Sequence, residues 1–296
     1  MPVDVFEQTC RLNHGKSMAF ITNFVLALYN QDKPTLLCVH GWLDNAQSFV
    51  PMLEFFNDYQ VILVDLMGHG KSDHRSLDAH YHLIDWVYDL KLFCQQLGLN
   101  QFYLIGHSLG GAISSVFAAS EAHLVKALVL LESPGAFTQP EHELAKNIHL
   151  AFESRIKIAD KLGKGLVKRP LNLIESLVQI RVDKNQLEPE FAKALIERNL
   201  NIESDGFSWR SDPRLQTLSP IRLTPTQAKE LLIAINCKVY VCLAENGYQV
   251  IRQTLERYFS QLKYGHLEYF DGSHHFHMPQ AEQVATYIKE KVINGA

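Results

Sequence analysis

The stretch LIGHSLGGA, residues 104–112, decides how this chain folds. It joins the apolar, β-rich run FYLI (102–105) to the helix-patterned run LGGAISSVFAAS (109–120), and Ser108 stands at the turn between them. Gly106 and Gly110 lie two positions to either side, where larger side chains would collide with neighbouring chain. This order of strand, sharp turn and helix predicts a nucleophile elbow that presents Ser108 at the end of a buried strand.

Short apolar runs of the same kind recur along the chain and alternate with helical periodicity. Continuous apolar runs that end in Gly or small polar residues indicate strands buried on both faces, which is typical of a parallel sheet. The N-terminal stretch to about residue 30 alternates instead like an antiparallel hairpin at a sheet edge. The sequence therefore predicts an α/β fold with a mostly parallel, doubly wound sheet. Its expected strands are 35–41, 61–68, 102–108, 127–133, 238–247 and 266–272, with helices at 44–56, 84–98, 109–120 and 279–292.

The interval 136–231 interrupts this alternation, because it holds helical patterns and no strand of the earlier type. A helical insertion between two core strands is the simplest account. We expect residues 1–135 and 232–296 to form the core and residues 136–231 to form a cap. Such a cap would cover the carboxyl ends of the strands, where ligands bind in sheets of this kind.

Composition narrows the class of protein further. A chain of 296 residues, 47% apolar and 20% charged, suits one large domain with an insertion. The net charge of −4 argues against nucleic acid or an anionic membrane as a partner. Five scattered cysteines without a close pair indicate a reducing compartment, and neither a signal peptide nor a membrane-spanning run is evident. We expect a soluble cytoplasmic protein with a small-molecule substrate; its oligomeric state stays open.

Three further motifs carry a family resemblance. They are VHGWLDNAQSF (39–49), DLMGHGKSD (65–73) and DGSHHFHM (271–278). Together with the elbow, they resemble the His-Gly loop, the Asp-x-x-Gly-x-Gly-x-Ser turn and the histidine loop of the α/β-hydrolase superfamily, over essentially the whole chain. The wording HGWLDNA, together with FSWRSDPRL (207–215), is closest to the branch called serine hydrolase-like proteins.

The resemblance implies roles for particular residues. Ser108 would be the nucleophile, and His274 would be the base, because the family's catalytic histidine follows a small residue and precedes a second histidine by three. The backbone amides of Trp42 and Leu109 would form the oxyanion hole. His277 would then pack the loop and His275 would be solvated. A metal site is the rival interpretation of these histidines, but the loop supplies few well-separated ligands, so we expect neither metal nor cofactor.

The triad acid departs from the family pattern. The turn Ala244–Gly247 resembles the Ala-Glu-x-Asp turn of epoxide hydrolases, yet Gly247 stands where Asp is expected. Glu132 is the first candidate, because haloalkane dehalogenases resemble this arrangement with an acid at the end of the same strand. Glu245 is the alternative, and another acid or none remains open.

Three aspartates have simpler expected roles. We expect Asp212 to pair with Arg210 or Arg214 in the cap, Asp65 to accept backbone hydrogen bonds in its turn, and Asp44 to cap the helix near Asn45.

These residues favour a serine hydrolase that acts on a small-molecule carboxylic ester through an acyl-enzyme. Trp42, Phe137, Phe207 and Trp209 are candidates to line an apolar pocket. Two alternatives remain: a Ser-His enzyme of another reaction, such as C–C bond hydrolysis, or a non-catalytic binding or interaction protein on a hydrolase scaffold.

Overall fold

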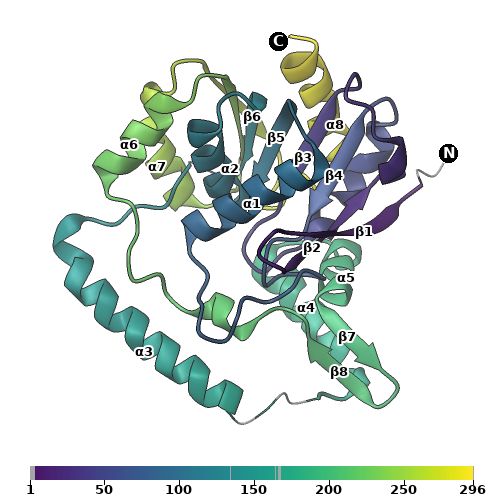
Figure 1. Cartoon of the computed structure of the whole chain (residues 1–296), viewed down its shortest axis with the longest axis vertical. Coiled ribbons are helices and arrows are strands. Elements are labelled where there is room, and N and C mark those ends of the chain that lie inside the picture. Colours follow the sequence, from purple (N-terminus) through teal and green to yellow (C-terminus); the bar gives the residue numbers. More distant parts are fainter. Residues whose placement is uncertain (1–3, 134, 164, 166–167, 296) are drawn as a thin grey trace.

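An eight-stranded sheet forms the centre of the molecule (Figure 1). The computed structural model describes residues 4–133, 135–163, 165 and 168–295. The strand order is β1-β2-β4-β3-β5-β6-β9-β10. The strands are β1 (Phe6–Arg11), β2 (Ser17–Thr22), β3 (Thr35–Val39), β4 (Gln60–Val64), β5 (Phe102–His107), β6 (Val125–Leu131), β9 (Lys238–Ala244) and β10 (Gly265–Phe270).

The sheet has the predicted mixture of parallel and antiparallel pairs. The strands from β4 to β10 in this order pair in parallel, whereas β1 pairs with β2, and β2 with β4, in antiparallel fashion. Every residue of β3, β4 and β5 is buried, because helices cover both faces. The α/β fold with a doubly wound sheet is thus confirmed.

Two helical layers enclose the sheet. One apolar core joins it to α1 (Leu83–Leu97), α2 (Leu109–Ser120), α6 (Pro225–Ala234) and α7 (Gln249–Tyr258). The other joins it to α8 (Ala281–Tyr287) and to residues Ala46–Phe55. That last segment was expected to be an α-helix but is a 3₁₀ helix with Pro51 inside it, which has no N–H to donate. None of the helices described is long and apolar enough to cross a bilayer.

The segment between β6 and β9 forms a small core, to which Met278 of the loop after β10 also belongs. It contains α3 (Leu144–Gly163), α4 (Ile174–Asn185), α5 (Pro189–Arg198) and a hairpin of β7 (Leu200–Glu203) and β8 (Gly206–Trp209). The sequence predicted helices here and missed the hairpin, whose strands are only four residues long. The expected cap boundary at residue 231 falls inside α6, which packs against α2 of the core.

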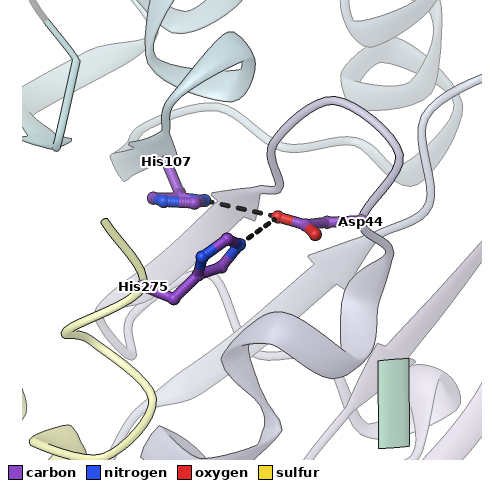
Figure 2. A group of neighbouring side chains, drawn as sticks. All are labelled: Asp44, His107 and His275. Atoms are coloured by element: carbon purple, nitrogen blue, oxygen red, sulfur yellow. Dashed lines mark hydrogen bonds and ion pairs between the residues drawn. The ribbon is translucent and has the colours of Figure 1, made fainter. Parts of the chain in front are cut away.

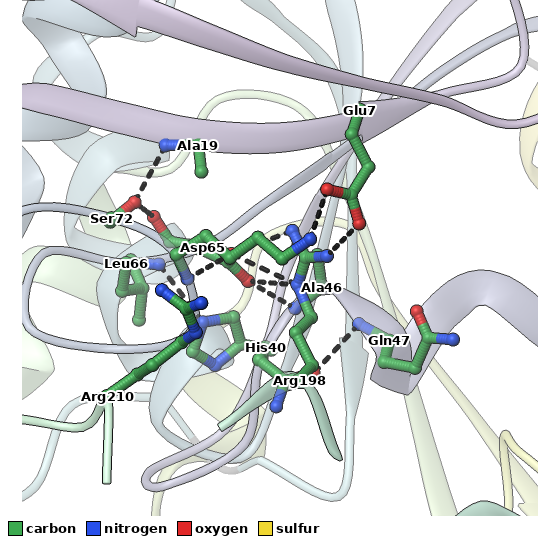
Figure 3. Close-up of polar contacts among 12 residues, drawn as sticks. Glu7, Ala19, His40, Ala46, Gln47, Asp65, Leu66, Ser72, Arg198 and Arg210 are labelled. Atoms are coloured by element: carbon green, nitrogen blue, oxygen red, sulfur yellow. Dashed lines mark hydrogen bonds and ion pairs between the residues drawn. The ribbon is translucent and has the colours of Figure 1, made fainter. Parts of the chain in front are cut away.

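A buried ion pair joins this segment to the sheet (Figure 3). Arg198, at the end of α5, donates from Nη2 to Asp65 at 2.8 Å and from Nη1 to Glu7 at 2.8 Å. Asp65 also accepts the backbone amides of Ala46 and Lys71, at 2.7 and 2.8 Å. The expected turn bonds of Asp65 are therefore present, and the pair with Arg198 adds a contact that the sequence did not predict.

Candidate active site

Ser108 has the backbone geometry of a nucleophile elbow. Its φ of 52° and ψ of −116° lie outside the conformations that ordinary residues favour, a strain that is typical of functional sites. A Cβ on Gly106 would lie 2.5 Å from the Gly110 oxygen, and one on Gly110 would lie 2.0 Å from the Val39 oxygen. Only glycine fits these positions, so the sequence argument from steric collision holds.

His274 lies in the loop after β10 and contacts a carboxylate. Its Nδ1 atom is 3.3 Å from Oε2 of Glu132, and the ring of Tyr248 stacks on it with centroids 4.3 Å apart. Burial lowers the pKa of His274 to about 4, although the hydrogen bond to Glu132 opposes this shift. Among the described residues, Nε2 of His274 makes no hydrogen bond, and it is not fully enclosed. The distal nitrogen therefore remains available.

Glu132 is fully buried at the end of β6 and is held from several sides. Its backbone has φ 47°, Oε1 accepts the Ala244 amide at 2.8 Å, and Oε2 accepts the Tyr248 amide at 3.3 Å. A Cβ on Gly247 would lie 2.3 Å from Oε1. The carboxylate of Glu132 thus fills the space that a side chain at position 247 would need.

Glu245 does not take part in this arrangement. It is exposed, and its carboxylate makes no hydrogen bond with the described residues, whereas its backbone amide donates to Phe270. Of the two acids considered from the sequence, the geometry brings only Glu132 to His274.

The loop after β3 lies beside the serine. A Cβ on Gly41 would be 3.3 Å from the Cβ of Ser108, so the backbone approaches closely there. Within the described residues, neither the amide of Trp42 nor that of Leu109 donates a hydrogen bond to the protein. Both are therefore free donors, and Leu109 begins α2, where the helix dipole favours negative charge.

The histidines beside His274 are buried, and one expectation is wrong. His275 was expected to be solvated but is 2% exposed, with Nε2 3.1 Å from Oδ2 of Asp44 (Figure 2). His277 packs in the interior as expected, with Nε2 2.8 Å from the Ser48 hydroxyl. Their Nε2 atoms have partners, and their Nδ1 atoms have none among the described residues but are fully enclosed, so neither ring offers an accessible base as His274 does.

The expected role of Asp44 as a helix cap is wrong, whereas the expected ion pair of Asp212 is present. Asp44 does not cap the following helix: Asn45 does so by accepting the Gln47 amide at 3.1 Å. Asp44 is instead buried beside histidines, so its sequence position gave no indication of its partners. Asp212 pairs with Arg214 at 2.7 Å, one of the two partners considered.

Asp44, His107 and His275 form a group of potential metal ligands. One ligand atom from each lies within 4.8 Å of the others, and all three residues are buried. The guanidinium of Arg181 also contacts the carboxylate of Asp44, the single acid in the group. Since that cation already balances the carboxylate's charge, a divalent ion would add uncompensated positive charge to a buried site. The donor set fits a hydrogen-bonded network better than a metal.

A cavity of about 270 Å³ lies between the insertion and the loop after β3. Leu43 contributes to it from the loop, and Arg181, Ile196 and Trp209 contribute from the insertion. Of the aromatics expected around a pocket, Trp209 lines this cavity, whereas Phe207 is fully buried in the small core. Trp42 and Phe137 are about half exposed, at 49% and 44%.

Comparison with known proteins places the chain in a family. A family model described as alpha/beta hydrolase fold matches residues 34–231. A serine hydrolase-like protein from Danio rerio is 26% identical over 265 residues, covering 86% of this chain and 80% of the relative. A probable serine hydrolase from Drosophila melanogaster is 24% identical over 275 residues, covering 88% and 81%. The solved structure of a hypothetical protein from Pseudomonas aeruginosa PAO1 has a TM-score of 0.85 and 26% identity, covering 97% of this chain and 99% of that one. With the elbow, the histidine loop and the sheet order already described, these matches show that the chain belongs to the α/β-hydrolase fold family, in its serine hydrolase-like branch.

Proposed function

We propose that the protein is a serine hydrolase that cleaves a small-molecule carboxylic ester, with Ser108, His274 and Glu132 as its triad. The observation that carries this proposal is the contact between Nδ1 of His274 and Glu132, which leaves Nε2 of the same ring free. A base held in this tautomer by a buried carboxylate is what activation of a serine requires. The serine hydrolase-like and probable serine hydrolase relatives support the same class of reaction.

The reaction would proceed in two halves. Ser108 Oγ attacks the ester carbonyl while Nε2 of His274 takes the hydroxyl proton, and the amides of Trp42 and Leu109 stabilise the oxyanion. Collapse of the tetrahedral intermediate expels the alcohol, which receives its proton from His274, and leaves an acyl-serine. Water, deprotonated by His274, then attacks the acyl-serine, and release of the acid restores Ser108.

The environment of His274 keeps its ring unprotonated at neutral pH. Burial lowers its pKa to about 4, so the ring is neutral and able to accept a proton near pH 7. Glu132 then stabilises the imidazolium as it forms during the reaction, which compensates the desolvation that disfavours it.

We also propose a cellular compartment for the protein. The five cysteines are free and four of them are buried, which fits a reducing compartment, and we assign the protein to the cytoplasm. Fractionation of cells that express the full chain with a small tag tests this assignment, and recovery in a secreted or organelle fraction contradicts it.

The first experiment is intact-mass labelling with a fluorophosphonate. We expect one adduct on the wild-type protein and none on Ser108→Ala, because only an activated serine reacts readily. Ser114→Ala is the matched control, since Ser114 is a buried serine of α2, and it should label like wild type. Labelling that persists in Ser108→Ala, or is absent from the folded wild type, contradicts the proposal.

A substrate panel tests the reaction class. Para-nitrophenyl acetate, butyrate and octanoate would be compared with an anilide of the same acyl group and with a vinylogous 1,5-diketone that reports C–C hydrolysis. Ester turnover that depends on Ser108 is the expected result. Turnover of the diketone alone would move the protein to the other reaction class, and labelling without any turnover would favour a binding protein.

A further inference from the structure

A second buried carboxylate lies beside the proposed triad. Asp44 is 2% exposed, and its Oδ2 atom is 3.1 Å from Nε2 of His275 and 3.6 Å from Nδ1 of His107 (Figure 2). The pKa of Asp44 lies well below its usual range despite burial, because His275 and Arg181 stabilise its charge. Nothing in the proposed chemistry uses this carboxylate directly.

The members of this cluster are chain neighbours of the proposed catalytic groups. Asp44 lies two residues after Trp42, while His107 directly precedes Ser108 and His275 directly follows His274. The three elements come from the ends of β3, β5 and β10, which are far apart in the sequence. The carboxylate of Asp44, in the loop after β3, therefore hydrogen-bonds to the histidine loop through His275 and lies beside His107 of the elbow.

The hydrogen bonds fix the direction of these links. Nε2 of His107 lies 2.9 Å from the backbone oxygen of His274, so that nitrogen carries the proton and donates it. Nε2 of His275 donates to the ionised Asp44 in the same way. His274 is consequently held at its backbone by the elbow and at its ring by Glu132.

The insertion supplies the counter-charge. Nη2 of Arg181, from α4, contacts Oδ1 of Asp44, and the arginine side chain is 17% exposed. Arg181 also lines the cavity between the insertion and the core. The position of α4 therefore affects a carboxylate in the loop after β3 that hydrogen-bonds to the histidine loop and lies beside the elbow.

We propose that Asp44 and Arg181 are positioning residues, through which the seating of α4 on the core aligns the Trp42 amide, Ser108 and His274. The inference rests on the proposed function and adds to it a second Asp-His pair that acts only through the triad. Removing Arg181 would leave Asp44 buried without its cation, and the loop after β3 would lose its contact with α4.

Kinetics of matched variants test the proposal. We expect Asp44→Asn and Arg181→Met to lower kcat about tenfold to a hundredfold with KM little changed, because small misplacements in a site cost that much. Arg181→Met should also melt at a lower temperature, since Asp44 loses its cation, so kcat is measured below the melting transition of each variant. Arg181→Lys should recover most of the rate. The double variant should be no slower than the slower single variant, since both changes break one link.

His74→Ala is the control for these variants. His74 makes another contact between core and insertion, with Nε2 2.6 Å from the Arg210 oxygen, but it touches none of the three loops. It should retain wild-type kcat. Equal losses in His74→Ala and Arg181→Met, or losses that simply add in the double variant, would overturn the proposal.

A second measurement separates this proposal from the proposed function. Long-range ¹⁵N–¹H spectra of histidine-labelled protein report which ring nitrogen carries the proton, without any substrate. We expect His275 to be protonated on Nε2 and His274 on Nδ1 in the wild type, and expect Asp44→Asn to shift the His275, His107 and His274 signals. If Ser108 proves unreactive, these signals still decide whether the network exists. Unchanged His274 and His107 signals, or signals that move on adding EDTA or zinc, would show that Asp44 does not position the triad in this way.

Discussion

Glu132 and Gly247 are complementary: the chain has no aspartate at position 247, and the carboxylate of Glu132 occupies the space there. The sequence identified Gly247 as a missing acid and left Glu132 and Glu245 open, because side-chain direction at a strand end depends on backbone angles that composition does not reveal. The φ of 47° at Glu132 turns its carboxylate toward the space over Gly247. Position 247 must therefore be glycine for the carboxylate of Glu132, the proposed triad acid, to reach His274.

Adding one methyl group at position 247 should disable the site. In Gly247→Ala the new Cβ would lie 2.3 Å from Oε1 of Glu132, so the carboxylate must leave the position in which it contacts His274. We expect kcat to fall by at least about a hundredfold, as for other losses of triad-acid function. Gly163→Ala is the control, since its Cβ meets nothing within 4 Å. Wild-type turnover in Gly247→Ala would mean that the Glu132 contact is not needed.

An acid placed at position 247 should also be able to replace Glu132. Glu132→Gly alone should lose activity, and adding Gly247→Asp should recover at least about tenfold of the loss, because the new carboxylate enters the emptied space. Glycine suits the positive φ at position 132, so the backbone is not strained further. Turnover numbers of the two variants, measured with the best ester of the panel, provide the check. A double variant as inactive as Glu132→Gly would argue that this space does not define the acid's position.

The pH profile should report His274. Its pKa is lowered by burial to about 4, and the ring must be neutral to accept the serine proton, so activity is lost as the pH falls through this value. We expect kcat/KM to stay level from pH 8 to about 5.5 and to be halved near pH 4. Stopped assays with brief exposure to acid measure this before unfolding intervenes. A midpoint near 6.5 would indicate a solvated base instead.

At the scale of elements, strands were more predictable than their connections. Continuous apolar runs identified five of the six parallel strands, because burial on both faces leaves little other choice of residue. The sixth, β10, was expected from HLEYFDG and is an edge strand whose residues are mostly exposed. The segment 46–55 matched a helical period, yet it is a 3₁₀ helix around Pro51, since spacing alone does not distinguish the two helix types over so few turns. The hairpin of β7 and β8 was missed because its pairing at Gly206 is local and short.

The contact between α5 and the sheet should dominate the stability of the insertion. Arg198→Met leaves Asp65 buried without its cation, and we expect a loss of about 3 kcal/mol in the free energy of unfolding. Lys193→Met on the same helix removes an exposed pair at 3.9 Å and should change it by less than about 0.5 kcal/mol. Urea unfolding at pH 7 compares the two. Equal, small changes would show that the buried pair contributes little.

Across the whole molecule, buried histidines link folding to pH. Burial lowers the pKa of His69 to about 3 and that of His274 to about 4, and it lowers the pKa of His40, His275 and His277 as well. The sequence indicated several of these rings as loop residues but gave no measure of their burial. The folded chain therefore excludes protons that the unfolded chain binds below about pH 6.5.

Stability should fall on mild acidification for this reason. Because the folded pKa values lie below the unfolded ones, their contribution is complete above about pH 6.5 and is lost as the pH falls toward the folded values. We expect the free energy of unfolding in urea to decrease steadily from pH 7 to pH 5, in a range where carboxylates contribute little. A value that stays constant over this range would contradict the linkage.

The place of Glu132 before the insertion also affects how the chain can be divided. Trp42, Ser108, Leu109 and Glu132 all precede the insertion, whereas His274 alone follows it. With the acid at position 247, two members of the proposed triad would instead follow the insertion. Cutting the backbone within the insertion would therefore separate the protein into one piece with the proposed nucleophile, oxyanion donors and acid, and another that supplies only the proposed base. Such a pair of fragments could serve as a reassembly reporter, in which esterase signal appears only when the two pieces meet.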